Sequence, residues 1–157
     1  MTLPGTAVGA HSAVRRARAA ALLLLTLVGG VLRFSSTDFG LPDKYRPDEE
    51  YMVSRALGFD RDWNPHFTVY PAAQMYVQHG VLRAYALLHG YKRNFREVYA
   101  TDKQALAWLI ARRTSAAFGT ATIPATYLAA AQAFGPQAAL AAATIVTFST
   151  IHVRESK

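Results

Sequence analysis

The sequence predicts an all-α fold: an integral membrane helical bundle of about three spans, with interfacial helices in a long first outer loop. Three observations predict it. The 157-residue chain is 52% hydrophobic and only 17% charged, whereas roughly a quarter of the residues in soluble domains are charged. Two long tracts, 19–32 and 114–151, carry no charged side chain. No segment shows a convincing strand pattern.

The first predicted span covers residues 14–34. Its uncharged core is short for the roughly 20 residues that a span needs. Arg18 and Arg33 flank this core, and their side chains can extend to the membrane interfaces and lengthen the usable helix. The arginine-rich end is expected in the cytoplasm by the positive-inside rule. A cleaved signal peptide is the alternative, but Leu32-Arg33-Phe34 is bulky and charged where small residues are needed for cleavage.

Residues 35–104 are predicted to form the long outer loop. Pro47 followed by three acidic residues indicates the start of a helix, because proline suits the first position and acids suit the first turn. Gly58 can end this helix. Its apolar residues fall on one face: Met52, Val53, Ala56 and Leu57. We expect that face to lie along the membrane surface.

Residues 70–90 are apolar but contain more polar residues than a span usually carries: Gln74, Gln78, His79, Arg83 and His89. If this segment lies on the outer surface, the C-terminal end of the chain shares a face with Asp48. If it crosses the membrane, the linker Lys92–Lys103 is cytoplasmic and its basic residues obey the positive-inside rule. The polar content favours the first topology.

A helical hairpin is predicted over 105–152. The sequence Phe134-Gly135-Pro136 ends one helix and starts another, which gives arms at 105–134 and 136–152. Gly119 and Pro124 can kink the first arm. Small residues dominate both arms and allow the helices to approach closely.

Three groups of residues in this order resemble the N-terminal part of the GT-C glycosyltransferases. They are Arg33-Phe34 with Gly40-Leu41-Pro42 and Arg46-Pro47-Asp48-Glu49, then Asn64-Pro65-His66-Phe67 with Tyr70-Pro71, and finally Ile151-His152-Val153-Arg154-Glu155-Ser156. The branch that these residues resemble contains the bacterial relatives of protein O-mannosyltransferases and the aminoarabinose transferases of lipid A. The resemblance covers the chain from about residue 30.

The resemblance implies a membrane enzyme that moves a sugar from a polyprenyl-phosphate donor to a protein, lipid or glycan acceptor on the outer side of a bacterial cell membrane. It implies that Asp48 is the base toward the acceptor hydroxyl or positions that hydroxyl, with Glu49 beside it. Family members run to several hundred residues, so 1–157 is expected to be a partial GT-C transmembrane domain, truncated relative to the family. The second acidic residue of the family would follow the C-terminal segment and is not in this chain.

The residue chemistry adds candidates for the donor phosphate. Arginine offers a planar fork that suits phosphate oxygens. We therefore expect Arg112, Arg113 and Arg154 to bind the donor, with Glu155 included because the favoured topology puts it on the same face. The alternative for each arginine is an anchor among lipid headgroups. For Asp48 and Glu49 the alternative is that they stabilise the start of a helix and take no part in catalysis.

Other classes of ligand have little support. The chain has no cysteine, no P-loop and no glycine-rich dinucleotide motif, and its histidines lack metal-ligand spacing. No cofactor is evident, although a divalent cation at Asp48 is possible by analogy with some GT-C enzymes. The net charge of +7 is spread among apolar stretches, which disfavours nucleic acid as a partner. The second hypothesis is a non-catalytic membrane protein with a partner-binding outer loop, or an inactive truncated product.

Overall fold

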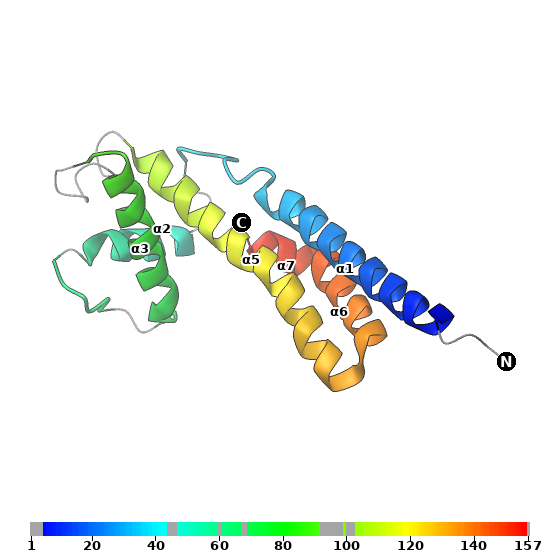
Figure 1. Ribbon diagram of the computed structural model, residues 1–157. Helices are drawn as coiled ribbons and strands as arrows, with labels where there is room; N and C mark the ends of the chain where they lie inside the picture. The colour runs from blue at the N-terminus through cyan, green and yellow to red at the C-terminus, as the bar shows by residue number, and fades with distance from the viewer. Residues whose placement is uncertain are drawn as a thin grey trace. The chain divides into compact units, whose positions relative to one another are not determined.

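The computed structural model describes residues 5–43, 47–59, 61–66, 69–91, 99 and 103–156, and all regular structure in them is helical (Figure 1). This confirms the predicted all-α class for the described residues. The helices are α1 (Gly5–Phe34), α2 (Pro47–Gly58), α3 (Ala72–Leu88), α5 (Gln104–Phe134), α6 (Pro136–Phe148) and α7 (Thr150–Glu155).

The chain divides into two units. The first, called here the hairpin unit, consists of Met1–Ser35 and Ala116–Lys157, and the second, the loop unit, is Ser36–Ser115. Helix α5 contributes its first part to the loop unit and its remainder to the hairpin unit. The predicted linker over 92–103 lies outside the described residues apart from Tyr99 and Lys103.

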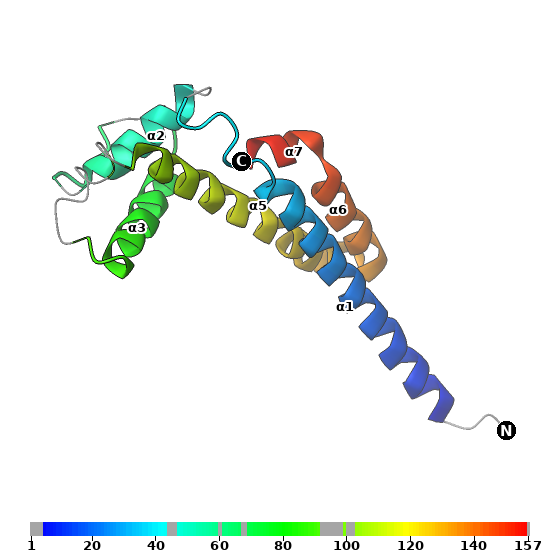
Figure 2. The same ribbon diagram turned by 90° about the horizontal axis from the view of Figure 1, so that it is seen from above.

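In the hairpin unit α6 packs along α1, and α7 contacts both helices (Figures 1 and 2). Helices α5 and α6 meet at Gly135, which has a φ of 84°, and Pro136 opens α6, as the sequence predicted. Helix α6 buries one face of small residues: Ala139, Ala143 and Thr147. A Cβ atom at Gly119 would lie 2.6 Å from the Cβ of Ser156, so this close approach requires glycine.

The second arm of the hairpin is not one helix over 136–152. Helix α6 stops at Phe148, and Ser149 is extended with φ −60° and ψ 111°. The Ser149 hydroxyl accepts a hydrogen bond from the His152 backbone N–H at 3.4 Å and thereby caps α7. Serine is among the preferred N-cap residues because its side chain competes for backbone N–H groups. That local preference ends α6 one turn earlier than the apolar pattern suggested.

Arg33 does not extend toward an interface as expected. Its side chain is fully buried and donates to the carbonyls of Gly29 at 3.0 Å and Val146 at 2.8 Å, and to Nδ1 of His152 at 2.9 Å. A longer contact reaches the carbonyl of Thr147 at 3.5 Å. The last carbonyls of a helix have no intrahelical partner. The guanidinium of α1 therefore caps the C-terminal end of α6.

Replacing Arg33 with leucine is expected to destabilise the protein by about 2–3 kcal/mol, because it leaves buried α6 carbonyls without a donor. Thermal unfolding in detergent micelles measures the effect. Arg15→Leu is the matched control: Arg15 is exposed on the same helix, and its loss should change stability by less than about 0.5 kcal/mol. Equal unfolding temperatures for the two variants would contradict a capping role for Arg33.

In the loop unit α2 packs against α3, and the first turns of α5 complete a small core. The core residues are Val53, Leu57, Leu82, Ala86, Tyr99, Ala107, Trp108 and Ala111. Helix α2 runs over the predicted residues, and three of its four predicted apolar positions are buried. The expectation that this face lies on the membrane surface is therefore wrong, because the face is covered by the protein's own core.

Among the described residues, one segment is long and apolar enough to cross a membrane: Ser12–Phe34 of α1. Its large apolar side chains, Leu23, Leu24, Leu27 and Val31, are exposed. Helix α6 is apolar but has 13 residues, and α3 has 17. The part of the chain that the structure describes thus contains one N-terminal apolar helix that fits a membrane span by length and composition.

Candidate active site

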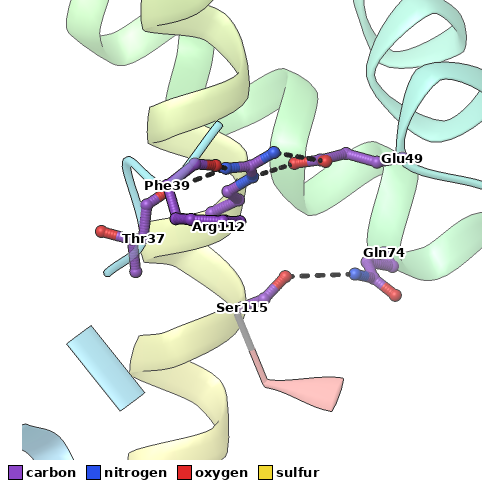
Figure 3. Close-up of polar contacts among 6 residues, drawn as sticks. All are labelled: Thr37, Phe39, Glu49, Gln74, Arg112 and Ser115. Atoms are coloured by element: carbon purple, nitrogen blue, oxygen red, sulfur yellow. Dashed lines mark hydrogen bonds and ion pairs between the residues drawn. The ribbon is translucent and has the colours of Figure 1, made fainter. Parts of the chain in front are cut away.

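The first turn of α2 and the first part of α5 are joined by an ion pair within the loop unit (Figure 3). Nε of Arg112 donates to Oε1 of Glu49 at 2.6 Å, and its Nη2 donates to Oε2 at 3.0 Å. The side chains of Arg112 and Glu49 are only 10% and 12% exposed. This bidentate, water-poor geometry is the arrangement in which arginine–carboxylate pairs are strongest.

The same guanidinium also holds the segment that precedes α2. Nη1 of Arg112 donates to the backbone carbonyls of Thr37 at 3.1 Å and Phe39 at 2.8 Å (Figure 3). The Arg112 fork is thus engaged by Glu49 and by this loop. Its geometry suits a positioning residue for the start of α2 better than the phosphate ligand that the sequence suggested.

A third contact ties α3 to this region. The side-chain amide of Gln74 donates to the hydroxyl of Ser115 at 3.4 Å, one turn along α5 from Arg112 (Figure 3). Gln74 is one of the polar residues that favoured a surface position over a membrane span for 70–90 in the sequence. Here that polar group serves to dock α3 on α5.

Asp48, in contrast to Glu49, is exposed at the start of α2. The phenol of Tyr70 donates a hydrogen bond to the Asp48 carboxylate, and this bond raises the pKa of Tyr70 above its ordinary value, with a smaller contribution from burial. The hydrogen bond orients the carboxylate while leaving it open to solvent. Two adjacent acids therefore have different environments: Glu49 is locked to Arg112, and Asp48 is accessible.

Replacing Asp48 with alanine removes the acceptor of this hydrogen bond and should move the pKa of Tyr70 down toward the usual value near 10. A raised folded pKa means that the bond stabilises the fold below pH 10 and that this contribution disappears as the pH rises through the folded pKa. NMR titration of isotope-labelled tyrosine measures the shift, and Tyr70→Phe assigns the signal. Asp38→Ala, at another exposed acid of the loop unit, should leave the Tyr70 titration unchanged.

The other predicted site residues take no part in the ion pair between Glu49 and Arg112. Arg113 is exposed and makes no hydrogen bond or ion pair with any residue that the structure describes. Arg154 and Glu155 belong to the hairpin unit, where Nε of Arg154 donates to Oε1 of Glu155 at 2.8 Å on the surface. Arg46, which stood next to the acidic pair in the sequence, lies outside the described residues.

Sequence reasoning missed two features of the site. No sequence signal links Tyr70 to Asp48, which lies 22 positions earlier in the chain. The carbonyls of Thr37 and Phe39 carry no side-chain signature at all. Within the described residues, no three His, Asp or Glu side chains gather around a metal position, and both Glu49 oxygens are taken by Arg112. This arrangement does not fit a divalent cation shared by Asp48 and Glu49.

No known protein family, curated protein or solved structure matches the chain.

Proposed function

We propose that this chain is part of a GT-C-type membrane glycosyltransferase that transfers a sugar from a polyprenyl-phosphate donor to an acceptor on the outer face of the membrane. The observation that carries the proposal is the pair of adjacent acids: an accessible Asp48 beside a Glu49 locked by Arg112. A base must reach its substrate, and its position must be fixed by neighbours that do not move.

In the proposed reaction the acceptor hydroxyl attacks C1 of the donor sugar. The new bond joins the acceptor oxygen to C1, and the bond from C1 to the phosphate oxygen breaks. The polyprenyl phosphate leaves with that electron pair, while Asp48 takes the hydroxyl proton. A single direct displacement of this kind inverts the anomeric centre, by analogy with glycoside hydrolysis. Glu49 and Arg112 act as positioning residues, because neither needs to touch the reacting atoms.

The leaving phosphate needs positive charge nearby. Arg113 supports this part of the proposal because its guanidinium is exposed and unengaged among the described residues. In the hairpin unit, Arg154 and Glu155 are proposed contacts for the headgroup of the lipid-linked donor. The proposal routes no step through a metal ion or a cofactor.

For the membrane arrangement we propose three spans: α1 and the two arms of the hairpin formed by α5 and α6. The distribution of side chains supports it. Large apolar residues of the hairpin unit are exposed, among them Phe118, Leu128, Phe134, Ile145 and Phe148, whereas the polar Arg33 and Thr147 are buried inside it. Lipid-facing bundles show this pattern, because the surrounding hydrocarbon cannot satisfy polar groups.

Because the natural chain lacks cysteine, single-cysteine labelling can test this topology. We expect a membrane-impermeant maleimide added to spheroplasts to label Ser54→Cys and Thr150→Cys and to spare Gln137→Cys. All three positions are exposed, so labelling reports sidedness. If Gln137→Cys is labelled and Thr150→Cys is protected, residues 70–90 cross the membrane and the three-span arrangement is wrong.

A transfer assay tests the function itself. The protein is reconstituted in nanodiscs with polyprenyl phosphates that carry radiolabelled sugars, and membrane extracts supply the acceptors. The expected result is loss of label from the lipid and its appearance in a second product. Photoactivatable polyprenyl phosphate should also label the protein, and Arg113→Ala should weaken that labelling more than Arg15→Ala does.

A second candidate function is a non-catalytic membrane protein whose outer loop binds a partner, or an inactive truncated product. The observation that favours it is the number of exposed apolar side chains on the loop unit, such as Phe39, Trp63, Val69 and Leu88. If the protein shows no sugar transfer and the photoactivatable lipid does not label it, this second function is favoured over the first.

A further inference from the structure

A pocket of about 670 Å³ opens on the solvent side of α2, away from the Glu49–Arg112 pair. One wall is a stripe of α2 residues at helical spacing: Glu50, Tyr51, Ser54, Arg55 and Gly58. The opposite wall consists of described residues that follow α2: Phe59, Arg61, Asp62, Asn64, Pro65 and His66. Nothing lies within 4 Å of the position that a Cβ atom would take at Gly58, so this glycine faces the open space. The volume falls in the usual range for small-molecule sites.

The second wall is held in shape by its own hydrogen bonds. The Asp62 carboxylate accepts from the backbone N–H of Asn64 at 2.9 Å and pairs with Nε2 of His66 at 2.6 Å. The Asn64 side-chain oxygen accepts from the backbone N–H of His66 at 2.9 Å. The two bonds to Asp62 lower the pKa of its carboxyl, so it is ionised at neutral pH. This wall is therefore built before any ligand arrives.

Ring contacts of Phe59 hold the second wall of the pocket against α3. Its ring is buried and stacks on Tyr76 of α3 with centroids 4.6 Å apart, and it also lies against Trp63 at 6.2 Å. The hydroxyl of Tyr76 donates to the carbonyl of Trp63 at 2.8 Å. Contacts of this kind hold the loop next to α2 and keep the pocket open.

The lining contains both signs of charge. Among the described lining residues there are two carboxylates, Glu50 and Asp62, and two guanidinium groups, Arg55 and Arg61, and the Asn64 carboxamide adds donors. Because the charges balance, a strongly anionic or cationic ligand gains little from the pocket as a whole. A ligand with many hydroxyl groups fits better, since each hydroxyl can donate to a carboxylate and accept from a guanidinium or an amide. The Tyr51 ring, half-exposed in the wall, offers an apolar face for a pyranose ring.

We propose that this pocket binds an uncharged saccharide. Its role as the acceptor subsite rests on the proposed function: Tyr51 lies three residues after Asp48 on the same helix, so the two are neighbours on its surface. A saccharide in the pocket would extend from Tyr51 toward the Asp48 carboxylate.

The test blocks the pocket without removing any of its polar groups. Gly58 is the last residue of α2 and has no positive φ, so Gly58→Leu fills the space without backbone strain. Gly80→Leu is the matched control, because Gly80 is an exposed glycine of α3 whose Cβ would also meet open space. Saturation-transfer NMR with maltose, cellobiose and lactose as probes measures binding, and inorganic phosphate serves as the charged comparator. Thermal unfolding checks that both variants are folded.

The expected result is binding of at least one neutral disaccharide to the wild type and to Gly80→Leu, with an affinity about tenfold weaker or undetectable in Gly58→Leu. Equal binding to both variants would overturn the proposal, and so would phosphate binding in the absence of any disaccharide binding. Asp48→Asn should retain disaccharide binding. Disaccharide binding without sugar transfer would support the saccharide pocket and reject the transferase function. Sugar transfer without disaccharide binding would support the transferase function and reject the saccharide pocket.

Discussion

Replacing Asp48 with asparagine is expected to lower the rate of sugar transfer by about 10²–10⁴-fold, the usual contribution of a positioned general base. Asparagine has nearly the same shape as aspartate but cannot take a proton. Its side-chain oxygen can still accept the Tyr70 hydrogen bond, so the local geometry should survive. Initial rates with a labelled polyprenyl-phosphate donor measure the effect, and kcat should fall far more than KM rises.

The matched control for this prediction is Asp38→Asn. Asp38 is another exposed acid of the loop unit, and its side chain makes no hydrogen bond or ion pair with any residue that the structure describes. Its transfer rate should stay within about twofold of the wild type. Unchanged transfer in the Asp48 variant, with normal unfolding temperatures, would remove this carboxylate from the mechanism and favour a partner-binding role for the outer loop.

Replacing Arg112 with alanine is expected to destabilise the protein by about 3–5 kcal/mol, because it leaves the Glu49 carboxylate buried without a counter-charge. The backbone carbonyls of Thr37 and Phe39 lose their donor at the same time. Denaturant or thermal unfolding in detergent measures the loss. Limited proteolysis should show new cleavage in the segment 36–43, which the guanidinium holds.

Two further variants separate the causes of this effect. Arg112→Lys keeps the charge but cannot reproduce the bidentate fork, so it should recover only part of the stability. The double variant Glu49→Met with Arg112→Met removes both charges and should be more stable than Arg112→Ala. Arg113→Ala, one residue along, should change stability by less than about 0.5 kcal/mol. If Arg113→Ala lost as much stability as Arg112→Ala, the ion-pair explanation would be contradicted.

The ends of several helices could be predicted from the sequence because the signals that set them are local. Pro47 and the acids after it start α2, and Gly58 ends it. Gly135 and Pro136 separate α5 from α6. Each of these residues acts on backbone groups within one turn of itself, so neighbouring residues in the sequence contain the necessary information.

The same local reasoning failed at Ser149, where two preferences compete. The apolar pattern continued past this residue and predicted one helix, but a serine hydroxyl can also cap a new helix. In α2 the pattern located the apolar face correctly. That face was predicted to lie on the membrane surface, but it packs against the protein's own core. Periodicity indicates which face is apolar, and it does not say whether lipid or protein covers that face.

The sequence by itself thus determined the all-helical class of the described residues, an apolar N-terminal helix and the acidic start of α2. Only the tertiary structure decided what the charged side chains do. Arg112 and Glu49 are 63 positions apart, and Arg33 and His152 are 119 apart. A buried guanidinium takes whichever carboxylate or carbonyl the fold brings within about 3 Å, because leaving it unpaired is costly. Which partner that is depends on helix packing, and residue spacing along the chain does not encode it.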